Sequence, residues 1–317
     1  MANQTPNRLG QINQAGAVDA LFQDIIQGEI MTAYEEKNVT DGFFMERTVV
    51  NGKGAEFHLM GNVSAFYHVP GEEILGGQVN HGKRLIGIDA KLVAPLFIDD
   101  LDEAMAAHDY RAPLTRKAGE ALAVINDRQR LQVAVLAARS TADIPDLPGG
   151  SAITEDVAGD MDDGAKLFDA LEEASAIMDE NDIPADGRYC FLPPRRYNKL
   201  ARLDDLVDRD VALGNGNKPE LKVSVAAGFK LIKTNHLPTT NITTGLMAGG
   251  DRAAYVGDYT KVRGLCVAME AIGTAKAIGL RSFPTWDSRR LGWDFKTWQA
   301  IGHGVLRPDA AIELRGL

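Results

Sequence analysis

The feature that most restricts the fold of this chain is a long extended excursion between residues 43 and 98. Two extended runs, 55–69 and 83–98, flank a Gly- and Pro-containing middle at 70–82 that has little to bury. An isolated two-stranded hairpin is only marginally stable in water. A long hairpin with a mobile tip therefore needs a partner surface, and another chain is one candidate for that partner.

The N-terminal region predicts a polar arm followed by a docking helix. Residues 1–16 are rich in Asn, Gln and Gly, and they have no core of their own. Apolar residues then recur at spacings of three and four over 18–36, which predicts one apolar stripe that includes Phe22 and Ile26. The sequence leaves open whether this stripe docks on a neighbouring subunit or on the chain's own body.

The remainder of the chain predicts a mixed α+β fold. Asp100 and Glu103 resemble a capping box that opens a helix, and Pro113 is expected to interrupt that helix. A longer helix is then expected at 114–139. A second amphipathic helix is expected at 163–182, and Pro194 should open a short helix that runs through Leu203. The predicted strands of this region share short apolar stretches: 189–192, 229–232, 253–256 and 265–269.

The charge of the chain is acidic and unevenly distributed. The net charge is −10, whereas residues 141–186 alone hold 14 Asp and Glu against one Lys, Lys166, a net of −13. Residues 281–317 hold 6 Lys and Arg against 4 Asp and Glu. This balance disfavours a protein that grips nucleic acid through its phosphates. Faces of opposite charge on one chain favour contacts between copies.

Catalytic and metal-binding patterns are missing from the sequence. The six His stand in no zinc or protease motif and are read as surface or loop residues. Cys190 and Cys266 sit in apolar runs, which predicts two reduced core thiols. The polar N-terminus lacks the apolar region of a signal peptide, and no apolar run reaches the length of a membrane span. We therefore expect no enzyme, no metal, no cofactor and no membrane partner.

Four local motifs carry a family resemblance. They are YHVPGEEI at 67–74, AAGFKLIKTNHLP at 226–238, AMEAIGTAK at 268–276 and AIGHGVLRPDAA at 300–311. Together, in this order, they resemble the major capsid proteins of short-tailed double-stranded DNA phages of the T-seven type. The resemblance covers nearly the whole chain.

The resemblance implies the Hong Kong 97 capsid fold. Its parts are then expected as an N-terminal arm at 1–45, an E-loop hairpin at 46–98, a P domain with a spine helix at 99–162, an A domain at 163–270 and returning C-terminal strands at 271–317. The acidic segment 141–186 matches none of the quoted motifs. Some capsids of this fold crosslink through an E-loop Lys, but no motif marks Lys53 or Lys83 for that role, and no crosslink is expected.

The resemblance also implies a function, which is self-assembly into pentamers and hexamers of an icosahedral head around the genome. The implied partners are other copies, a scaffolding protein, a portal protein, a cement or decoration protein and DNA contacted without sequence specificity. The protein is expected in the virion, after assembly in the bacterial cytoplasm. Ten residues are predicted to contact other subunits: Phe22, Ile26, Phe66, Tyr67, Pro70, Gly71, Glu72, Glu73, Arg289 and Arg290.

Two alternative functions remain to be tested. An encapsulin-type compartment shares the fold but should lack the phage motifs at 226–238 and 300–311. A soluble α/β enzyme needs a convergent polar constellation, and the sequence offers none.

Overall fold

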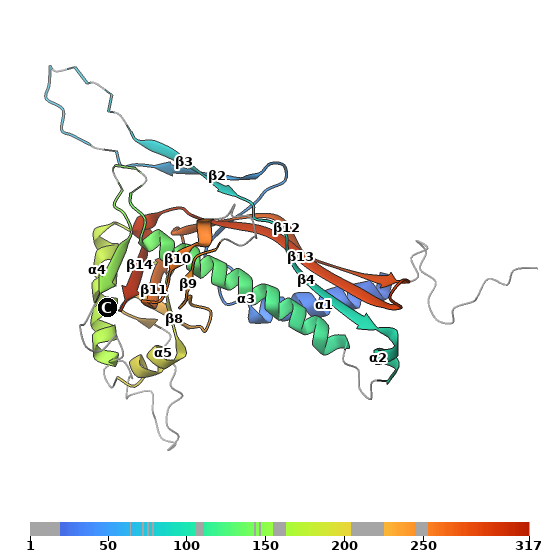
Figure 1. Cartoon of the computed structure of the whole chain (residues 1–317). Coiled ribbons are helices and arrows are strands. Elements are labelled where there is room, and N and C mark those ends of the chain that lie inside the picture. The colour runs from blue at the N-terminus through green and yellow to red at the C-terminus, as the bar shows by residue number, and fades with distance from the viewer. Residues whose placement is uncertain are drawn as a thin grey trace, which may run out of the picture. The chain divides into compact units, whose positions relative to one another are not determined.

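The computed structural model describes most of the chain. The described residues are 20–63, 65–71, 73–74, 76–77, 79–105, 111–142, 144–145, 147–154, 163–203, 225–244 and 253–316, without the side chains of 20–28, 102–104, 111 and 253. Figure 1 shows the order of the elements along the chain. The chain forms two compact units: unit 1 comprises 1–38, 91–124 and 278–299, and unit 2 comprises 39–90, 125–277 and 300–317.

Unit 1 combines helices with β4 and parts of β12 and β13, three strands of the sheet with the order β1-β12-β13-β4. It holds the helices α1 (Ala20–Lys37) and α2 (Asp100–Met105), the strand β4 (Leu92–Asp99), and the first half of α3 (Arg111–Ala138). β4 pairs antiparallel with the start of β13 (Gly292–Val305). Ile30, Ile98 and Phe295 form its buried core. Gly119 lets α1 approach α3, because a Cβ there would lie 2.6 Å from the Ile30 carbonyl oxygen.

Unit 2 is built on a six-stranded sheet with the order β5-β14-β11-β6-β8-β7. Its strands are β5 (Ser151–Thr154), β6 (Arg188–Leu192), β7 (Val225–Ala226), β8 (Phe229–Lys233), β11 (Val262–Ala268) and β14 (Ala311–Arg315). The shorter elements of the unit are β9 (Asn241–Ile242), β10 (Gly257–Asp258), and 3-10 turns at Ala253–Tyr255 and Pro308–Ala310.

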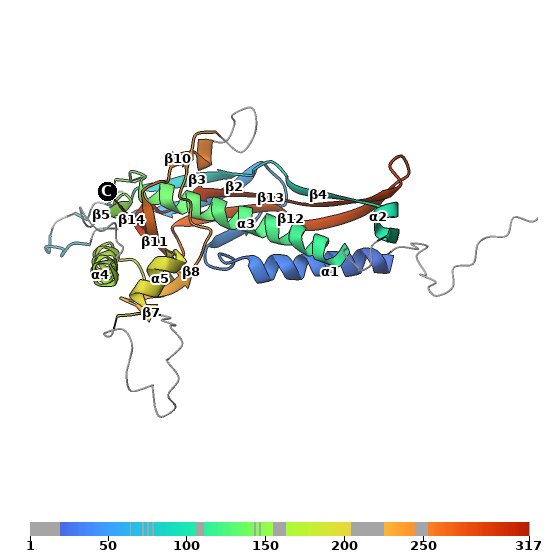
Figure 2. The same ribbon diagram turned by 60° about the horizontal axis from the view of Figure 1, so that its bottom comes forward.

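Two helices accompany this sheet, α4 (Gly164–Glu180) and α5 (Pro194–Leu200), and Figure 2 shows them beside each other. α4 is amphipathic, and its apolar side, including Leu167 and Leu171, is fully buried. Burial of such large apolar side chains contributes about 1.5–3 kcal/mol each. The second half of α3 adds Leu131 and Val135 to the same core.

The extended excursion forms a separate ribbon within unit 2. β2 (Gly54–Met60) pairs antiparallel with β3 (His81–Gly87), in the register Gly54↔Gly87 to Met60↔His81. β1 (Met45–Thr48) instead pairs parallel with the start of β12 (Ile272–Asp287). The predicted run 83–98 is therefore wrong as one element, because it divides into β3 and β4, which belong to different sheets.

Several local predictions are confirmed and others need correction. Cys190 and Cys266 are free, fully buried and directly opposite each other on β6 and β11. The expected strand at 253–256 is wrong, because residues 253–255 form a 3-10 turn. The cap of α2 lies one residue earlier than predicted, since Asp99 accepts a hydrogen bond from the Leu101 amide. In the described part of the chain, no helix is long and apolar enough to cross a bilayer.

Candidate assembly surfaces

Figure 1 shows the segment 61–80, which joins β2 to β3. Its exposed large apolar residues are Val63, Phe66, Tyr67, Val69, Ile74 and Val79. Water-facing groups of this size are unusual when several occur together, and they mark contact sites for other proteins. Of the predicted contact residues, Phe66, Tyr67, Pro70, Gly71 and Glu73 lie here and are exposed, whereas Glu72 lies outside the described residues.

The turn in this segment is formed by Pro70 and Gly71. Gly71 adopts a φ of +100°, which ordinary L residues rarely take, and open space surrounds the position that a Cβ would occupy. Pro70 fixes its own φ and offers no amide donor. The backbone therefore reverses here without help from neighbouring side chains.

The stem of the same ribbon is anchored on the chain's own body. Alternate residues of β2, Ala55, Phe57 and Leu59, are buried together with Ile144 and Leu306. The partner surface that a long hairpin requires is thus provided within unit 2 for β2 and β3. Beyond this stem, the segment 61–80 presents several apolar side chains to solvent, and on the stem itself Met60 and Leu85 are exposed as well.

The turn between β12 and β13 carries Arg289 and Arg290 in unit 1. Asp287 holds the turn, since its carboxylate accepts a hydrogen bond from the Arg289 amide. The Arg290 guanidinium lies 6.0 Å from the ring centroid of Phe97 and 3.9 Å from the Asp287 carboxylate. Nearby Phe283, Trp286 and Leu291 are exposed, so the turn joins two cations to an apolar surface.

The C-terminal half of α1 docks on its own unit. Ile30 and Ala33 are buried, and Thr115 donates a hydrogen bond to the Glu29 carboxylate. The side chains of Phe22 and Ile26 lie outside the described residues. Their role as contacts between subunits stays a prediction, as do the roles of the other eight residues.

A buried polar group on α3 was missed by the sequence reasoning. The Asp127 carboxylate is fully buried and accepts hydrogen bonds from the Val39 amide, the Thr40 amide and the Thr40 hydroxyl, at 2.9, 3.1 and 2.6 Å. His236 Nδ1 lies 2.9 Å from the same carboxylate. A carboxylate only accepts, so Nδ1 carries the proton in this contact. Asp127 therefore joins α3 to the segments before β1 and after β8.

Asn126, next to Asp127, and Arg130, about one turn further along α3, make further buried contacts. Asn126 Oδ1 lies 3.0 Å from His303 Nε2, while His303 Nδ1 lies 3.0 Å from the Thr274 hydroxyl. Burial, together with the positive charge of Arg130, lowers the pKa of His303 well below its usual value. The neutral ring therefore donates through Nε2 and accepts at Nδ1. Arg130 itself binds Thr40 and Glu46.

These contacts correct the interpretation of the histidines and explain the motifs. His236 and His303 are buried and hydrogen-bonded, not surface residues. His236 lies in the motif at 226–238, His303 in the motif at 300–311, and Thr274 in the motif at 268–276. Three of the four quoted motifs thus hold the fold of unit 2 together. A signal was present in the sequence, since Asn126, Asp127 and Arg130 interrupt the apolar face of the predicted helix.

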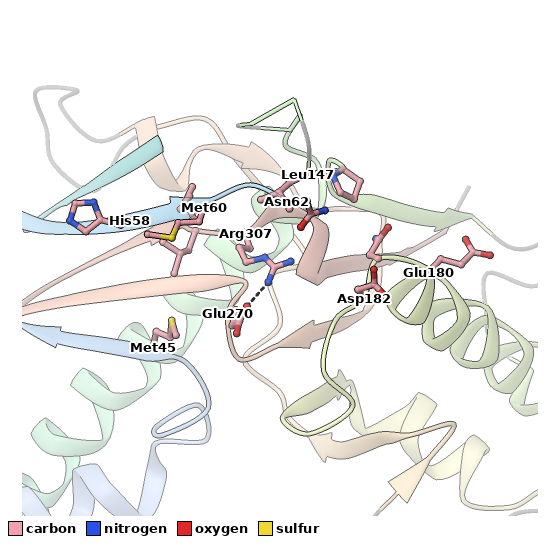
Figure 3. A pocket seen from close by; sticks show the side chains of 13 residues that line it. Met45, His58, Met60, Asn62, Leu147, Glu180, Asp182, Glu270 and Arg307 are labelled. Carbon is pink, nitrogen blue, oxygen red and sulfur yellow. Dashed lines mark hydrogen bonds and ion pairs between the residues drawn. The ribbon is translucent and has the colours of Figure 1, made fainter. Parts of the chain in front are cut away.

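A cavity of about 580 Å³ lies in unit 2 beside the end of β2 (Figure 3). Met45, Met60 and Leu147 provide apolar surface, and the C-terminal end of α4 contributes Glu180. Arg307 in the cavity wall donates hydrogen bonds to the carboxylates of Glu270, at 2.5 Å, and Asp309, at 2.6 Å, so its charge is neutralised within the chain. The described residues contain no cluster of three or more His, Cys, Asp or Glu suited to a metal ion.

Comparisons with known proteins agree with this architecture. A family model described as "Gp10A-like: Major capsid protein" matches residues 56–315. The chain is 30% identical to the major capsid protein of Escherichia phage T7 over 94% of its own length and 92% of that protein. The capsid structure of cyanophage P-SCSP1u superposes with a TM-score of 0.78, at 35% identity, over 100% of this chain and 99% of that one.

A more distant structure shares the fold but little of the sequence. The virus-like particle from Pyrococcus furiosus shares only 12% identity, with a TM-score of 0.55 over 93% of this chain and 99% of that one, which shows likeness of fold alone. The predicted Hong Kong 97-type α+β fold is confirmed by the phage capsid structures. The encapsulin alternative is not favoured, because the family model and the 30% identical relative are phage proteins. The chain therefore belongs to the family of Gp10A-like major capsid proteins.

Proposed function

We propose that the chain assembles into the pentamers and hexamers of an icosahedral head, with the segment 61–80 as a principal contact between subunits. As a major capsid protein of a double-stranded DNA phage, the chain is a structural component of the virion and not an enzyme. The observation that supports the contact is the combination of a stem packed on its own unit with a segment of exposed apolar side chains.

The anchored stem gives this segment a physical advantage. Because β2 and β3 are already ordered, less conformational entropy is lost when segment 61–80 meets a neighbour. Each copy then gives one contact and receives another, as closed rings require. Many such contacts made at once stabilise a shell whose single contacts remain reversible.

The further partners belong to the same proposal. A scaffolding protein, a portal protein and a cement or decoration protein are expected to meet this chain during assembly. Packaged DNA is expected to make only non-specific contact, which the net charge of −10 supports. Tight, salt-sensitive DNA binding by isolated subunits would contradict this expectation.

The test replaces two exposed side chains, Phe66→Ser together with Tyr67→Ser. The free energy of unfolding should stay within about 0.5 kcal/mol of wild type, because both side chains face solvent. Shells, measured by sedimentation and negative-stain electron microscopy, should be lost. Val50→Ser is the control, since Val50 is an exposed apolar residue in the turn between β1 and β2 and lies outside 61–80. Normal shells from the double variant would refute the role of this segment.

A further inference from the structure

We infer that the outer face of α5 binds the outer face of α4 in a second copy of this chain, through charge complementarity. This contact rests on the proposed function, since it names two surfaces that would meet between neighbouring subunits. Both surfaces belong to unit 2.

The basic surface is formed by Arg195, Arg202 and Lys233, here called the α5 basic face. Tyr197 and Leu200 are buried and hold α5 on the core, which leaves Arg195 exposed on its outer side. Arg202 is exposed in the turn that follows the helix. Lys233 from β8 is exposed and extends over the Tyr197 ring, with Nζ 5.7 Å from the centroid. No Asp or Glu occurs in 187–203 or in 225–244, although the chain as a whole is acidic.

The acidic surface is formed by Asp169, Glu172 and Glu173, here called the α4 acidic face. All three are exposed, while the opposite side of the helix is fully buried in the core of unit 2. Within the described part of the chain none of the three forms an ion pair. Asp179 differs, since its carboxylate binds Arg188 at 2.7 Å.

The two faces are held as one body but do not neutralise each other. The start of α4 touches the end of α5, where a Cβ on Gly164 would lie 2.7 Å from the Lys199 carbonyl oxygen. Among the described residues no ion pair joins the two helices, and neither Arg195 nor Arg202 binds an Asp or Glu there. Within the described residues, each copy therefore presents a cationic face and an anionic face that form no ion pair with each other.

Identical copies can satisfy both faces in a head-to-tail contact. Such a contact uses two different surfaces on each subunit, which is the arrangement that closes into rings. Opposite charges also fix the register of the contact and oppose approach in the wrong orientation. DNA is a poorer partner for the α5 basic face, because the carboxylates of α4 lie on the same body and repel phosphate.

The test is a charge swap in the full chain. One variant carries Arg195→Glu and Arg202→Glu, a second carries Glu172→Lys and Glu173→Lys, and a third carries all four changes. Lys53→Glu with Lys261→Glu is the control, since both residues are exposed and the change in net charge equals that of the first variant. Shell yield is measured by sedimentation and electron microscopy at low and at high salt, and folding is measured by thermal unfolding.

We expect each reversed pair to lower the shell yield at low salt by about tenfold or more, because the altered contact recurs around every ring. The fourfold variant should regain most of the yield, and the control should match wild type. Salt should weaken the wild-type contact as well, since exposed charges are screened.

Three results would overturn this inference. The first is normal shell yield from both reversed pairs, and the second is a folded fourfold variant that fails to assemble. The third is normal assembly of the Arg195→Glu, Arg202→Glu variant with less retained DNA, which would assign the face to nucleic acid. Failure of the wild-type chain to form shells would instead contradict the proposed function itself.

Discussion

Removal of the Asp127 carboxylate should destabilise the chain more than any change on its exposed surface. Asp127→Ala leaves the Val39 amide, the Thr40 amide, the Thr40 hydroxyl and the His236 ring without their acceptor in a buried site. A buried donor without a partner costs about 1–3 kcal/mol. Partial relaxation of the segment before β1 reduces the summed penalty of these donors, so we expect the free energy of unfolding to fall by about 3–5 kcal/mol.

The measurement is urea unfolding of unassembled protein, followed by far-ultraviolet circular dichroism. Trp fluorescence is less suitable, because all three Trp lie at 286–298 in unit 1, whereas Asp127 lies in unit 2. Arg128→Ala is the control on the same helix, since Arg128 is exposed and should change stability by less than about 0.5 kcal/mol. Asp127→Asn should fall between the two, because an amide retains one accepting oxygen.

The reasoning fails if Asp127→Ala and Arg128→Ala unfold at the same urea concentration. It also fails if Asp127→Ala loses less than about 1 kcal/mol, because one unsatisfied donor alone should cost that much. Either result would mean that the segment before β1 does not depend on α3 for its position.

Two further predictions concern other buried positions in unit 2. Gly302→Ala should lower the free energy of unfolding by about 3 kcal/mol or more, because the new Cβ would lie 2.0 Å from the Gly87 carbonyl oxygen. Thermal unfolding measures this loss, and Gly77→Ala is the control, because open space surrounds that position. Equal melting temperatures for the two variants would contradict the prediction. His303 is neutral in the folded chain because its pKa is lowered, so the unfolded state binds the extra proton below about pH 6.5 and stability falls as the pH falls. When the pH is lowered from 7.5 to 5.5, the free energy of unfolding measured with urea should fall by about 1.4 kcal/mol more in wild type than in His303→Gln. Equal decreases in the two proteins would be evidence against a neutral buried ring.

Periodic segments of the sequence predicted their elements well. The helix expected at 163–182 is α4, and the strand expected at 189–192 is β6, because a local pattern of apolar residues was enough to define each. The long helix was predicted from residue 114, but it begins at Arg111, since Pro113 is tolerated in a first helical turn. On the same helix the apolar residues Ala121 and Ile125 are exposed, although apolar residues at such spacings usually face a core.

The contacts between distant segments could not be read from the sequence. Alternation along 83–98 indicates extended structure, but it cannot say that the first half pairs with β2 and the second with β13. Likewise, Asp127 is a polar residue whose burial depends on Val39, Thr40 and His236, residues far away in the chain. The ten predicted contact residues come from the apolar stripe at 18–36, from the motif at 67–74 with its preceding residue, and from the basic pair at 289–290. Such local patterns do not identify the surface of a neighbouring copy that each residue would meet.

The position of β14 has a consequence for how the protein is made. This strand, residues 311–315, lies between β5 and β11 in the six-stranded sheet, so the sheet remains divided until the ribosome has delivered that segment. Unit 1 likewise cannot be completed until residues 278–299 have been synthesised. Neither unit can finish folding early in translation, unlike a chain whose domains mature one after another from the N-terminus. A polypeptide that stops before residue 311 would lack an interior strand of this sheet, which would keep unfinished copies out of a growing lattice.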